Sequence, residues 1–103
     1  MNIRQARKTD IHQIAHIYSV CFPNERSHLE WITACFQSAP KGIYYVVEAD
    51  SEIVGYILWC VKNGFREKTI VELEQVGVHP DFSGKGYGKH LVIDTFNLFK
   101  NHT

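Results

Sequence analysis

One stretch of this chain carries its strongest signal for the fold. Residues 76–89 have the sequence VGVHPDFSGKGYGK, in which a Val-Gly-Val segment and a His-Pro pair precede three glycines at alternate positions. Glycine adopts backbone conformations that other residues avoid, and a run of this kind lets several backbone amides point at one anion. The stretch therefore predicts the end of a strand, a tight turn suited to phosphate, and the start of a helix.

The spacing of these glycines excludes two other phosphate-binding loops. A Walker loop has four residues between its glycines and Ser or Thr after its lysine, whereas Gly84 and Gly88 enclose three residues and His90 follows Lys89. A dinucleotide fingerprint reads GxGxxG, but this turn reads GxGxG. Lys85 and Lys89 add positive charge at the rim, which favours a phosphate or pyrophosphate. On the glycines alone, a tight connection that binds nothing stays open as an alternative.

The hydrophobic periodicity of the rest of the chain alternates between strand and helix. Strands are predicted at residues 2–5, 43–48, 53–61 and 70–78, and helices at 11–22, 27–36 and from 86 onward. Asp10 and Ser27 are the expected N-caps of the first two helices. Residues 63–69 are expected to form a loop that is longer than a two-residue hairpin turn. The order of elements predicts a mixed α/β, or α+β, fold.

Length and composition narrow the class of protein. The 103 residues predict one small domain, residues 1–103, and 45% hydrophobic with 21% charged residues is typical of a globular protein. Eleven basic and eleven acidic residues balance, so no overall field favours nucleic acid or an anionic membrane as a partner. The chain has no signal peptide and no run of about 18 apolar residues, so the cytoplasm is the expected location. Cys21, Cys35 and Cys60 are widely spaced, which favours reduced, packed thiols.

The whole stretch resembles motif A of the GNAT superfamily of N-acetyltransferases, which is written Q/R-x-x-G-x-G/A. The segment SGKGYG, residues 83–88, has both glycines of that motif. The segments IRQA at residues 3–6 and EIVGYI at residues 52–57 look like the opening strand and first hairpin of the family. This resemblance covers the entire chain. It implies a GNAT-like fold with a mixed, mostly antiparallel sheet and the order β-α-α-β-β-β-α.

The resemblance also implies a cosubstrate and a reaction. The chain would bind acetyl-CoA and transfer the acetyl group to a primary amine by direct attack. The backbone of Val76, Gly77 and Val78 would pair with the pantetheine arm. The turn would bind the pyrophosphate mostly through backbone amides, so side-chain variation at Lys85 or Tyr87 should be tolerated. The residues implied for the turn are Ser83, Gly84, Lys85, Gly86, Tyr87, Gly88 and Lys89.

The chain departs from the family pattern in two ways. Ser83 stands where the family usually has Gln or Arg, and a hydroxyl brings no charge to a pyrophosphate. The family fold continues after this helix with a strand, a helix and two strands, whereas the sequence ends at Thr103. We therefore expect a fold that lacks this C-terminal β-α-β-β part. The outer edge of strand 70–78 would then be unpaired, and a homodimer through that edge is the expected remedy.

Two carboxylates are candidates for the catalytic base. A primary ammonium has a pKa near ~10.4, so the acceptor amine needs a base or ordered water to lose its proton at neutral pH. Glu72 and Glu74 lie on one face of the predicted strand by its two-residue period. Glu72 falls where the histone-acetylating branch of the family places its glutamate base, and Glu74 is the weaker candidate. A solvated surface carboxylate is the alternative for both.

Other reactive side chains receive no role in the chemistry. Tyr87 occupies a spacer position of the motif and is expected to pack rather than to act as the general acid. His12 and His16 are four residues apart, as in half a zinc site, but Gln13 replaces the Glu of HExxH, so we expect both to be exposed and predict no metal. His79 is expected to be a turn residue.

Three functions follow from these observations and stay open. The first is an acetyl-CoA-dependent N-acetyltransferase, acting as a dimer or with an acceptor site that a partner supplies. The second is a catalytically silent acyl-CoA-binding module, which the missing C-terminal half and the absent Gln or Arg would favour. The third is a truncated remnant that binds no ligand. The acceptor itself is not defined by the sequence.

Overall fold

The computed structural model describes residues 1–62 and 70–101, and the loop predicted at 63–69 lies outside this range. Two short 3-10 helices are also present, one before the first α-helix and one before the last. The predicted order of elements is confirmed, with boundaries that differ by one residue. In chain order the elements are β1 (Asn2–Gln5), η1 (Lys8–Asp10), α1 (Ile11–Cys21), α2 (His28–Gln37), β2 (Gly42–Ala49), β3 (Glu52–Val61), β4 (Val71–Val78), η2 (Pro80–Phe82) and α3 (Tyr87–Lys100).

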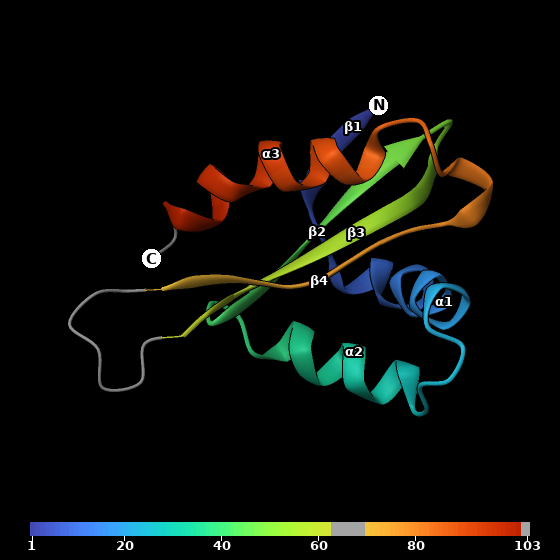
Figure 1. Cartoon of the computed structure of the whole chain (residues 1–103). Coiled ribbons are helices and arrows are strands. Elements are labelled where there is room, and N and C mark those ends of the chain that lie inside the picture. Colours follow the sequence, from blue (N-terminus) through green and yellow to red (C-terminus); the bar gives the residue numbers. More distant parts are fainter. Residues whose placement is uncertain (63–69, 102–103) are drawn as a thin grey trace.

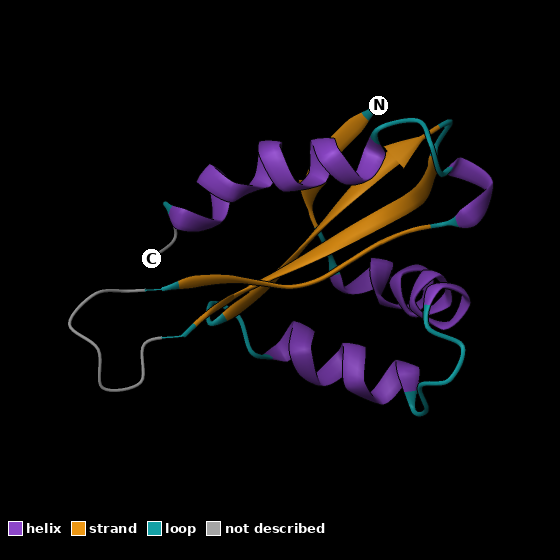
Figure 2. Cartoon of the chain, in the orientation of Figure 1, coloured by secondary structure: helices purple, strands orange, loops and turns teal. Residues whose placement is uncertain are grey.

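The four strands form one antiparallel sheet in the order β1-β2-β3-β4. Helices α1 and α2 cover one face of the sheet and α3 covers the other (Figures 1 and 2). Strand β3 lies between β2 and β4, and residues 54–59 are buried without interruption. Such a strand has to be apolar on both faces, as its sequence predicted.

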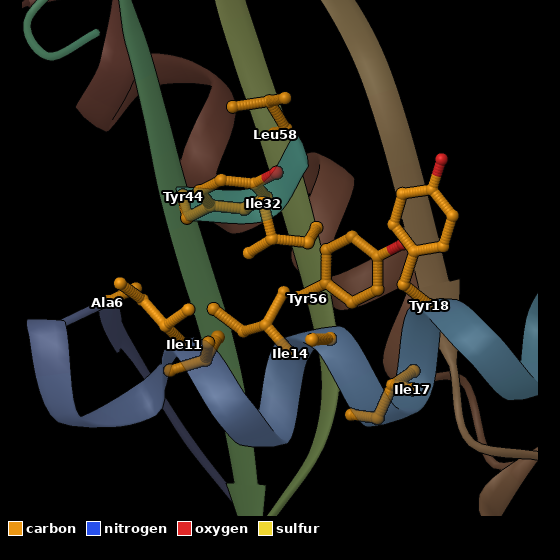
Figure 3. Packing of buried hydrophobic residues seen from close by; sticks show 11 residues of the cluster. Ala6, Ile11, Ile14, Ile17, Tyr18, Ile32, Tyr44, Tyr56 and Leu58 are labelled. Atoms are coloured by element: carbon orange, nitrogen blue, oxygen red, sulfur yellow. The ribbon is translucent and has the colours of Figure 1, made fainter. Parts of the chain in front are cut away.

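The face toward α1 and α2 is filled by alternate residues of β2 and β3. Tyr44, Tyr56 and Leu58 point from the strands toward Ile14 of α1 and Ile32 of α2, and all five are at most 2% exposed (Figure 3). Because neighbouring residues of a strand point to opposite faces, the residues between them fill the other core. The apolar face of α1, with its helical period, therefore packs against the apolar face of the strands, with its two-residue period, in one continuous core.

The face toward α3 is closed by Trp59 of β3. Its ring lies 5.5 Å from the Phe96 ring and 6.5 Å from the Phe99 ring, centroid to centroid. The Trp59 indole N–H donates to Thr95 Oγ1 at 2.7 Å, and the Thr95 hydroxyl donates to the Leu91 carbonyl one turn earlier in α3. Thr95 is fully buried, so its hydroxyl satisfies two polar groups that water cannot reach.

Thr95→Val should lower the free energy of unfolding by about 2 kcal/mol, because the Trp59 N–H would be left buried without an acceptor. Thr33→Val in α2 is the matched control. The Thr33 hydroxyl makes the same bond to the carbonyl four residues earlier, that of Leu29, but no indole donates to it in the described structure. Urea denaturation of both variants tests this, and an equal loss at the two threonines would contradict it.

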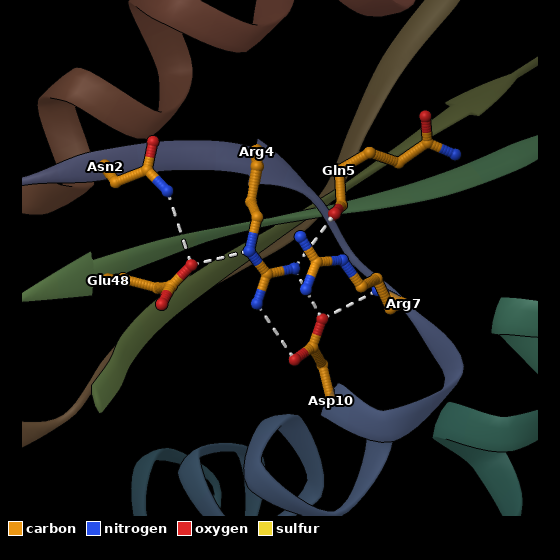
Figure 4. A network of polar contacts seen from close by, with 6 residues as sticks. All are labelled: Asn2, Arg4, Gln5, Arg7, Asp10 and Glu48. Carbon is orange, nitrogen blue, oxygen red and sulfur yellow. Dashed lines mark hydrogen bonds and ion pairs between the residues drawn. The ribbon is translucent and has the colours of Figure 1, made fainter. Parts of the chain in front are cut away.

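Asp10 and Ser27 are the N-cap residues of α1 and α2, as expected, but the expected side-chain bonds are absent. Neither residue accepts a hydrogen bond from its helix through the side chain. Ser27 has a positive φ of 55°, and only its backbone carbonyl accepts, from the Trp31 N–H at 3.0 Å. The Asp10 carboxylate is instead held by Arg4 of β1 and by the Arg7 N–H (Figure 4). A short-range capping rule fails here because a guanidinium from another element competes for the same carboxylate.

Candidate cofactor-binding site

Strand β4 presents one of its edges without a strand beside it in the described part of the chain. The His79 N–H donates to the Val54 carbonyl at 2.8 Å, so the backbone of His79 faces β3. Backbone groups in an antiparallel pair alternate between the neighbouring strand and the other side. The amide and carbonyl groups of Val76 and Val78 therefore face the open edge. These are two of the three residues that the resemblance assigns to the pantetheine arm.

The third of these residues, Gly77, has a packing role. Gly77 pairs with Tyr56 of β3, and a Cβ at Gly77 would lie 2.8 Å from Tyr56 Cε1. The Tyr56 ring thus crosses β4 at this glycine, and its hydroxyl donates to Gln75 Oε1 at 2.6 Å. Gly77 is needed here because the ring of the neighbouring strand occupies the space of a side chain.

The turn between β4 and α3 leaves several amides without an acceptor in the helix. The His90 N–H donates to the Gly86 carbonyl at 3.0 Å, which is the first bond of α3. The N–H groups of Tyr87, Gly88 and Lys89 precede that bond and have no partner within the helix. They also lie at the positive end of the helix dipole. This local geometry favours an anion as a ligand.

The three glycines of the turn are not equivalent. Gly84 and Gly86 have φ of +77° and +84°, in the left-handed region that glycine tolerates best. Gly88 lies inside α3, where a Cβ would meet only Val78 Cγ2 at an ordinary 3.7 Å. No described atom lies within 4 Å of a Cβ placed at Gly84, so this side of the turn is open.

The residues that flank these glycines contact one another and hold the shape of the turn. The Ser83 hydroxyl donates to the Pro80 carbonyl at 2.9 Å. The Tyr87 ring packs 6.4 Å from the Phe82 ring, and Lys85 Nζ lies 5.9 Å above the same ring. Lys85 and Lys89 are both exposed. Side chains within the turn thus mainly shape it, while the backbone amides are left to meet a ligand.

Glu72 and Glu74 both face the α2 side of the sheet. The pairing of β3 with β4 shifts at Glu74, since Leu58 pairs with Gln75 and Trp59 pairs with Leu73. This bulge adds one residue to β4 and places Glu74 and Gln75 on the same side. Glu72 is 49% exposed and lies 3.9 Å from Lys62 Nζ. A two-residue period predicts the shared face of the glutamates, but it does not predict that Gln75 joins them.

A hollow of about 370 Å³ lies between α2 and the sheet on this side. Glu74 of β4, Trp31 and Cys35 of α2, and Cys60 of β3 are among the residues that line it. Burial raises the pKa of Cys60 to about 11, so its thiol stays protonated near neutral pH. The hollow therefore combines a carboxylate, an aromatic ring and uncharged thiols.

A contact between Cys21 and the open edge of β4 was not predicted from the sequence. Cys21, at the end of α1, donates from Sγ to the Val78 carbonyl at 3.3 Å. Burial raises the pKa of this thiol, so it is a protonated donor. The free cysteine gave no local signal of this role, because its partner is 57 residues away. Because Cys21 already donates to the Val78 carbonyl, the backbone groups that remain at this edge are the Val78 N–H and the N–H and carbonyl of Val76.

The histidine pair of α1 is exposed, as predicted. The rings of His16 and His79 are stacked with centroids 5.9 Å apart. Among the residues described, no group of three or more His, Cys, Asp or Glu side chains is arranged to hold a metal ion. No described helix has the length and apolarity needed to cross a membrane.

Comparison with known proteins identifies the family. The model of the acetyltransferase (GNAT) family matches residues 11–102, which is most of the chain. The chain belongs to this family, and it is an acetyltransferase by family. The resemblance seen in the turn and the preceding strands is thereby confirmed. Comparison with curated protein sequences gives no match.

Solved structures with the same fold include several acetyltransferases. A GNAT family acetyltransferase from Brucella melitensis in complex with acetyl-CoA is 25% identical, with a TM-score of 0.80 over 98% of this chain and 69% of that one. Aminoglycoside N-acetyltransferase AAC(6')-Iy in complex with CoA is 22% identical, with a TM-score of 0.80 over 98% and 70%. An aminoglycoside 6'-N-acetyltransferase complexed with coenzyme A is 18% identical, with a TM-score of 0.82 over 98% and 56%.

Proposed function

We propose that this protein transfers an acetyl group from acetyl-CoA to a primary amine. The observation that carries the proposal is the start of α3, where the amides of Tyr87, Gly88 and Lys89 precede the first helical bond beside two glycines of positive φ. This arrangement suits a pyrophosphate. The open edge of β4, at Val76 and Val78, precedes this turn in the chain, so a ligand with a pyrophosphate and an extended amide arm would use both features.

The residues present fit acetyl-CoA as cosubstrate. The backbone of Val76 and Val78 would pair with the amides of the pantetheine arm, as an added strand pairs with a sheet edge. Residues 84–89 would bind the pyrophosphate, with Lys85 and Lys89 at the rim. Ser83 would contribute by shaping the turn, since its hydroxyl is already bonded to the Pro80 carbonyl. Acetyl-CoA would supply an activated thioester for attack by the amine.

Calorimetry and turnover together test this function. Acetyl-CoA should bind, and a panel of primary amines should include at least one that releases free coenzyme A in the presence of the protein. Binding without turnover of any amine would favour a silent acyl-CoA-binding module. No heat with millimolar acetyl-CoA would contradict the proposal and favour a fold without a cofactor site.

The hollow beside Glu74 is the proposed entrance for the amine. A cationic acceptor would be attracted by the carboxylates of Glu74 and Glu72, and the Trp31 ring would pack against its carbon skeleton. Both glutamates lie on the α2 face of β4, the strand whose edge would bind the thioester arm. We propose Glu72 as the general base, acting through water, with Glu74 as the weaker candidate.

Glu72→Gln should lower turnover at neutral pH by about tenfold. This is less than the usual contribution of a general base, because water reaches a half-exposed carboxylate and can take over part of its role. The loss should shrink at high pH, where more of the amine is already deprotonated. Lys62→Gln is the control, since it removes the ion pair of Glu72 and leaves its carboxylate. A pH profile of turnover is the measurement, and equal rates for Glu72→Gln and the wild type at every pH would eliminate Glu72.

A homodimer through the edge of β4 is also proposed. The acidic residues Glu72 and Glu74 lie at the start of β4, and the basic residues Lys85 and Lys89 follow its end. Antiparallel pairing of two β4 strands sets the acidic start of one copy near the basic turn of the other, which favours association. Light scattering at micromolar concentration should give twice the mass of the chain. Val76 and Val78 cannot pair with a second β4 and with the pantetheine arm at once, so the dimer is proposed for the ligand-free protein. A monodisperse ligand-free monomer would contradict the dimer and leave the proposed cofactor site in place.

A further inference from the structure

His79 occupies the junction between β4 and the cofactor turn. Its backbone N–H bonds to Val54 of β3, and its side chain turns forward to cap η2. His79 Nδ1 accepts from the Asp81 N–H at 3.1 Å. An imidazole nitrogen that accepts a hydrogen bond carries no proton, so the other ring nitrogen of a neutral His79 bears it. The side chain therefore determines how the chain leaves the sheet.

The turn after η2 depends on such external support. Gly84 and Gly86 have no side chains with which to anchor the backbone, and a Cβ at Gly84 would touch nothing. The position of the amides is therefore set by the residues on either side. On the upstream side these supports are the His79 cap and the bond from the Ser83 hydroxyl to the Pro80 carbonyl.

A row of aromatic rings runs beside this support, from α1 to α3. His16 of α1 stacks on His79 at 5.9 Å, His79 meets the Phe82 ring edge-on at 6.3 Å, and Phe82 packs against Tyr87 at 6.4 Å, all between centroids. Tyr87 is the first residue of α3 and supplies one of the unpaired amides. His79 is thus the point at which the capping bond and the row of rings coincide.

We propose that His79 is a positioning residue for the cofactor turn and that the acceptor atom of its ring, rather than the ring itself, performs this role. The inference rests on the proposed binding of acetyl-CoA. His79 does not touch the cofactor in this proposal. It acts through η2, holding the amides of residues 84–89 in the geometry that accepts a pyrophosphate before the ligand arrives.

Two substitutions separate the acceptor from the ring. His79→Asn keeps a side-chain acceptor that can reach the N–H two residues on, and it removes the ring. His79→Phe keeps a ring of similar size and removes the acceptor. Loss of a capping acceptor corresponds to about 1 kcal/mol, so His79→Phe should bind coenzyme A about fivefold more weakly. His79→Asn should bind it like the wild type, and His12→Asn, an exposed histidine of α1, is the matched control.

The readout combines calorimetry with coenzyme A and amide hydrogen exchange of the ligand-free protein. In His79→Phe, exchange at Asp81 and over residues 84–89 should be faster, and the Michaelis constant for acetyl-CoA should rise while the turnover number is kept. Equal weakening in His79→Asn and His79→Phe, or no weakening in either, would overturn the proposal. If the wild type binds no coenzyme A, the proposed function fails, and unequal exchange at Asp81 in the two variants would still support the positioning role. Equal exchange there would overturn it.

Discussion

Replacing Gly86 by valine should weaken the binding of acetyl-CoA by about 100-fold, because two costs combine. Gly86 has φ of +84° and is the N-cap of α3, a conformation that a β-branched residue strongly disfavours. The backbone would relax away from it and turn the amides of Tyr87 and Gly88 out of their common direction. Each hydrogen bond from such an amide to a charged ligand contributes about 1.5–3 kcal/mol, so misplacing even one has a large effect.

Gly88→Ala is the matched control for this prediction. Gly88 lies inside α3, and a Cβ there would meet Val78 Cγ2 at 3.7 Å, an ordinary contact. Alanine also has the higher helix propensity, so this variant should be as stable as the wild type or more so. Calorimetry with acetyl-CoA, after circular dichroism has shown that both variants fold, is the measurement. A Gly86→Val protein that binds like Gly88→Ala would show that the turn does not hold the pyrophosphate.

The second large effect is expected on stability, at Arg4. The Arg4 guanidinium bonds to both carboxylate oxygens of Asp10, at 2.7 and 3.1 Å, and also to Glu48 of β2 (Figure 4). The Asp10 side chain is only 9% exposed. Arg4→Leu would leave that carboxylate buried without its main partner, which should lower the free energy of unfolding by about 3 kcal/mol. Arg7→Leu changes an exposed arginine nearby and should cost about 0.5 kcal/mol or less.

The loss at Arg4 should depend on pH. The bond from Arg4 lowers the pKa of Asp10 below its ordinary value of about 3.9. A carboxylate with a lowered pKa contributes stability above that ordinary value, and the contribution is lost as the pH falls through the folded-state pKa. Urea denaturation of the wild type and Arg4→Leu from pH 7 to pH 3 should show the difference between them shrinking. A difference independent of pH would mean that Arg4 stabilises the fold through packing alone.

The fold was largely predictable because its signals are local. The β-branched and aromatic run at residues 43–48 and the apolar run at residues 53–61 predict two strands, the second buried on both faces. The helical period of residues 11–22 predicts α1. The predictions failed where a distant group competes with a local one. Asp10 has the residue type of an N-cap, but Arg4 binds its carboxylate. The pattern of residue types along the chain does not reveal that Arg4 competes for this carboxylate, because the competition depends on how β1 packs beside α1.

The candidate site was likewise predictable from the sequence only where its features are local. Three alternate glycines and two lysines before a helical pattern predict an anion-binding turn, because backbone conformation at glycine and the unpaired amides of a helix start are properties of a short segment. The roles of the individual glycines are not local. Gly77 makes room for Tyr56, whereas Gly84 and Gly86 meet a backbone requirement and Gly88 does neither. The three glycines of the turn are evenly spaced in the sequence, so only their surroundings separate Gly88 from Gly84 and Gly86.

The sequence by itself therefore determined the order of the elements, the burial of β3 on both faces and the turn that opens α3. The tertiary structure decided which groups of β4 and of the turn remain available to a ligand. It brings the Cys21 thiol to the carbonyl of Val78, shifts Gln75 to the side of Glu72 through the bulge at Glu74, and places His79 beneath the turn. The reason is physical: periodicity and backbone preference act over a few residues, while these contacts require packing of segments far apart in the chain.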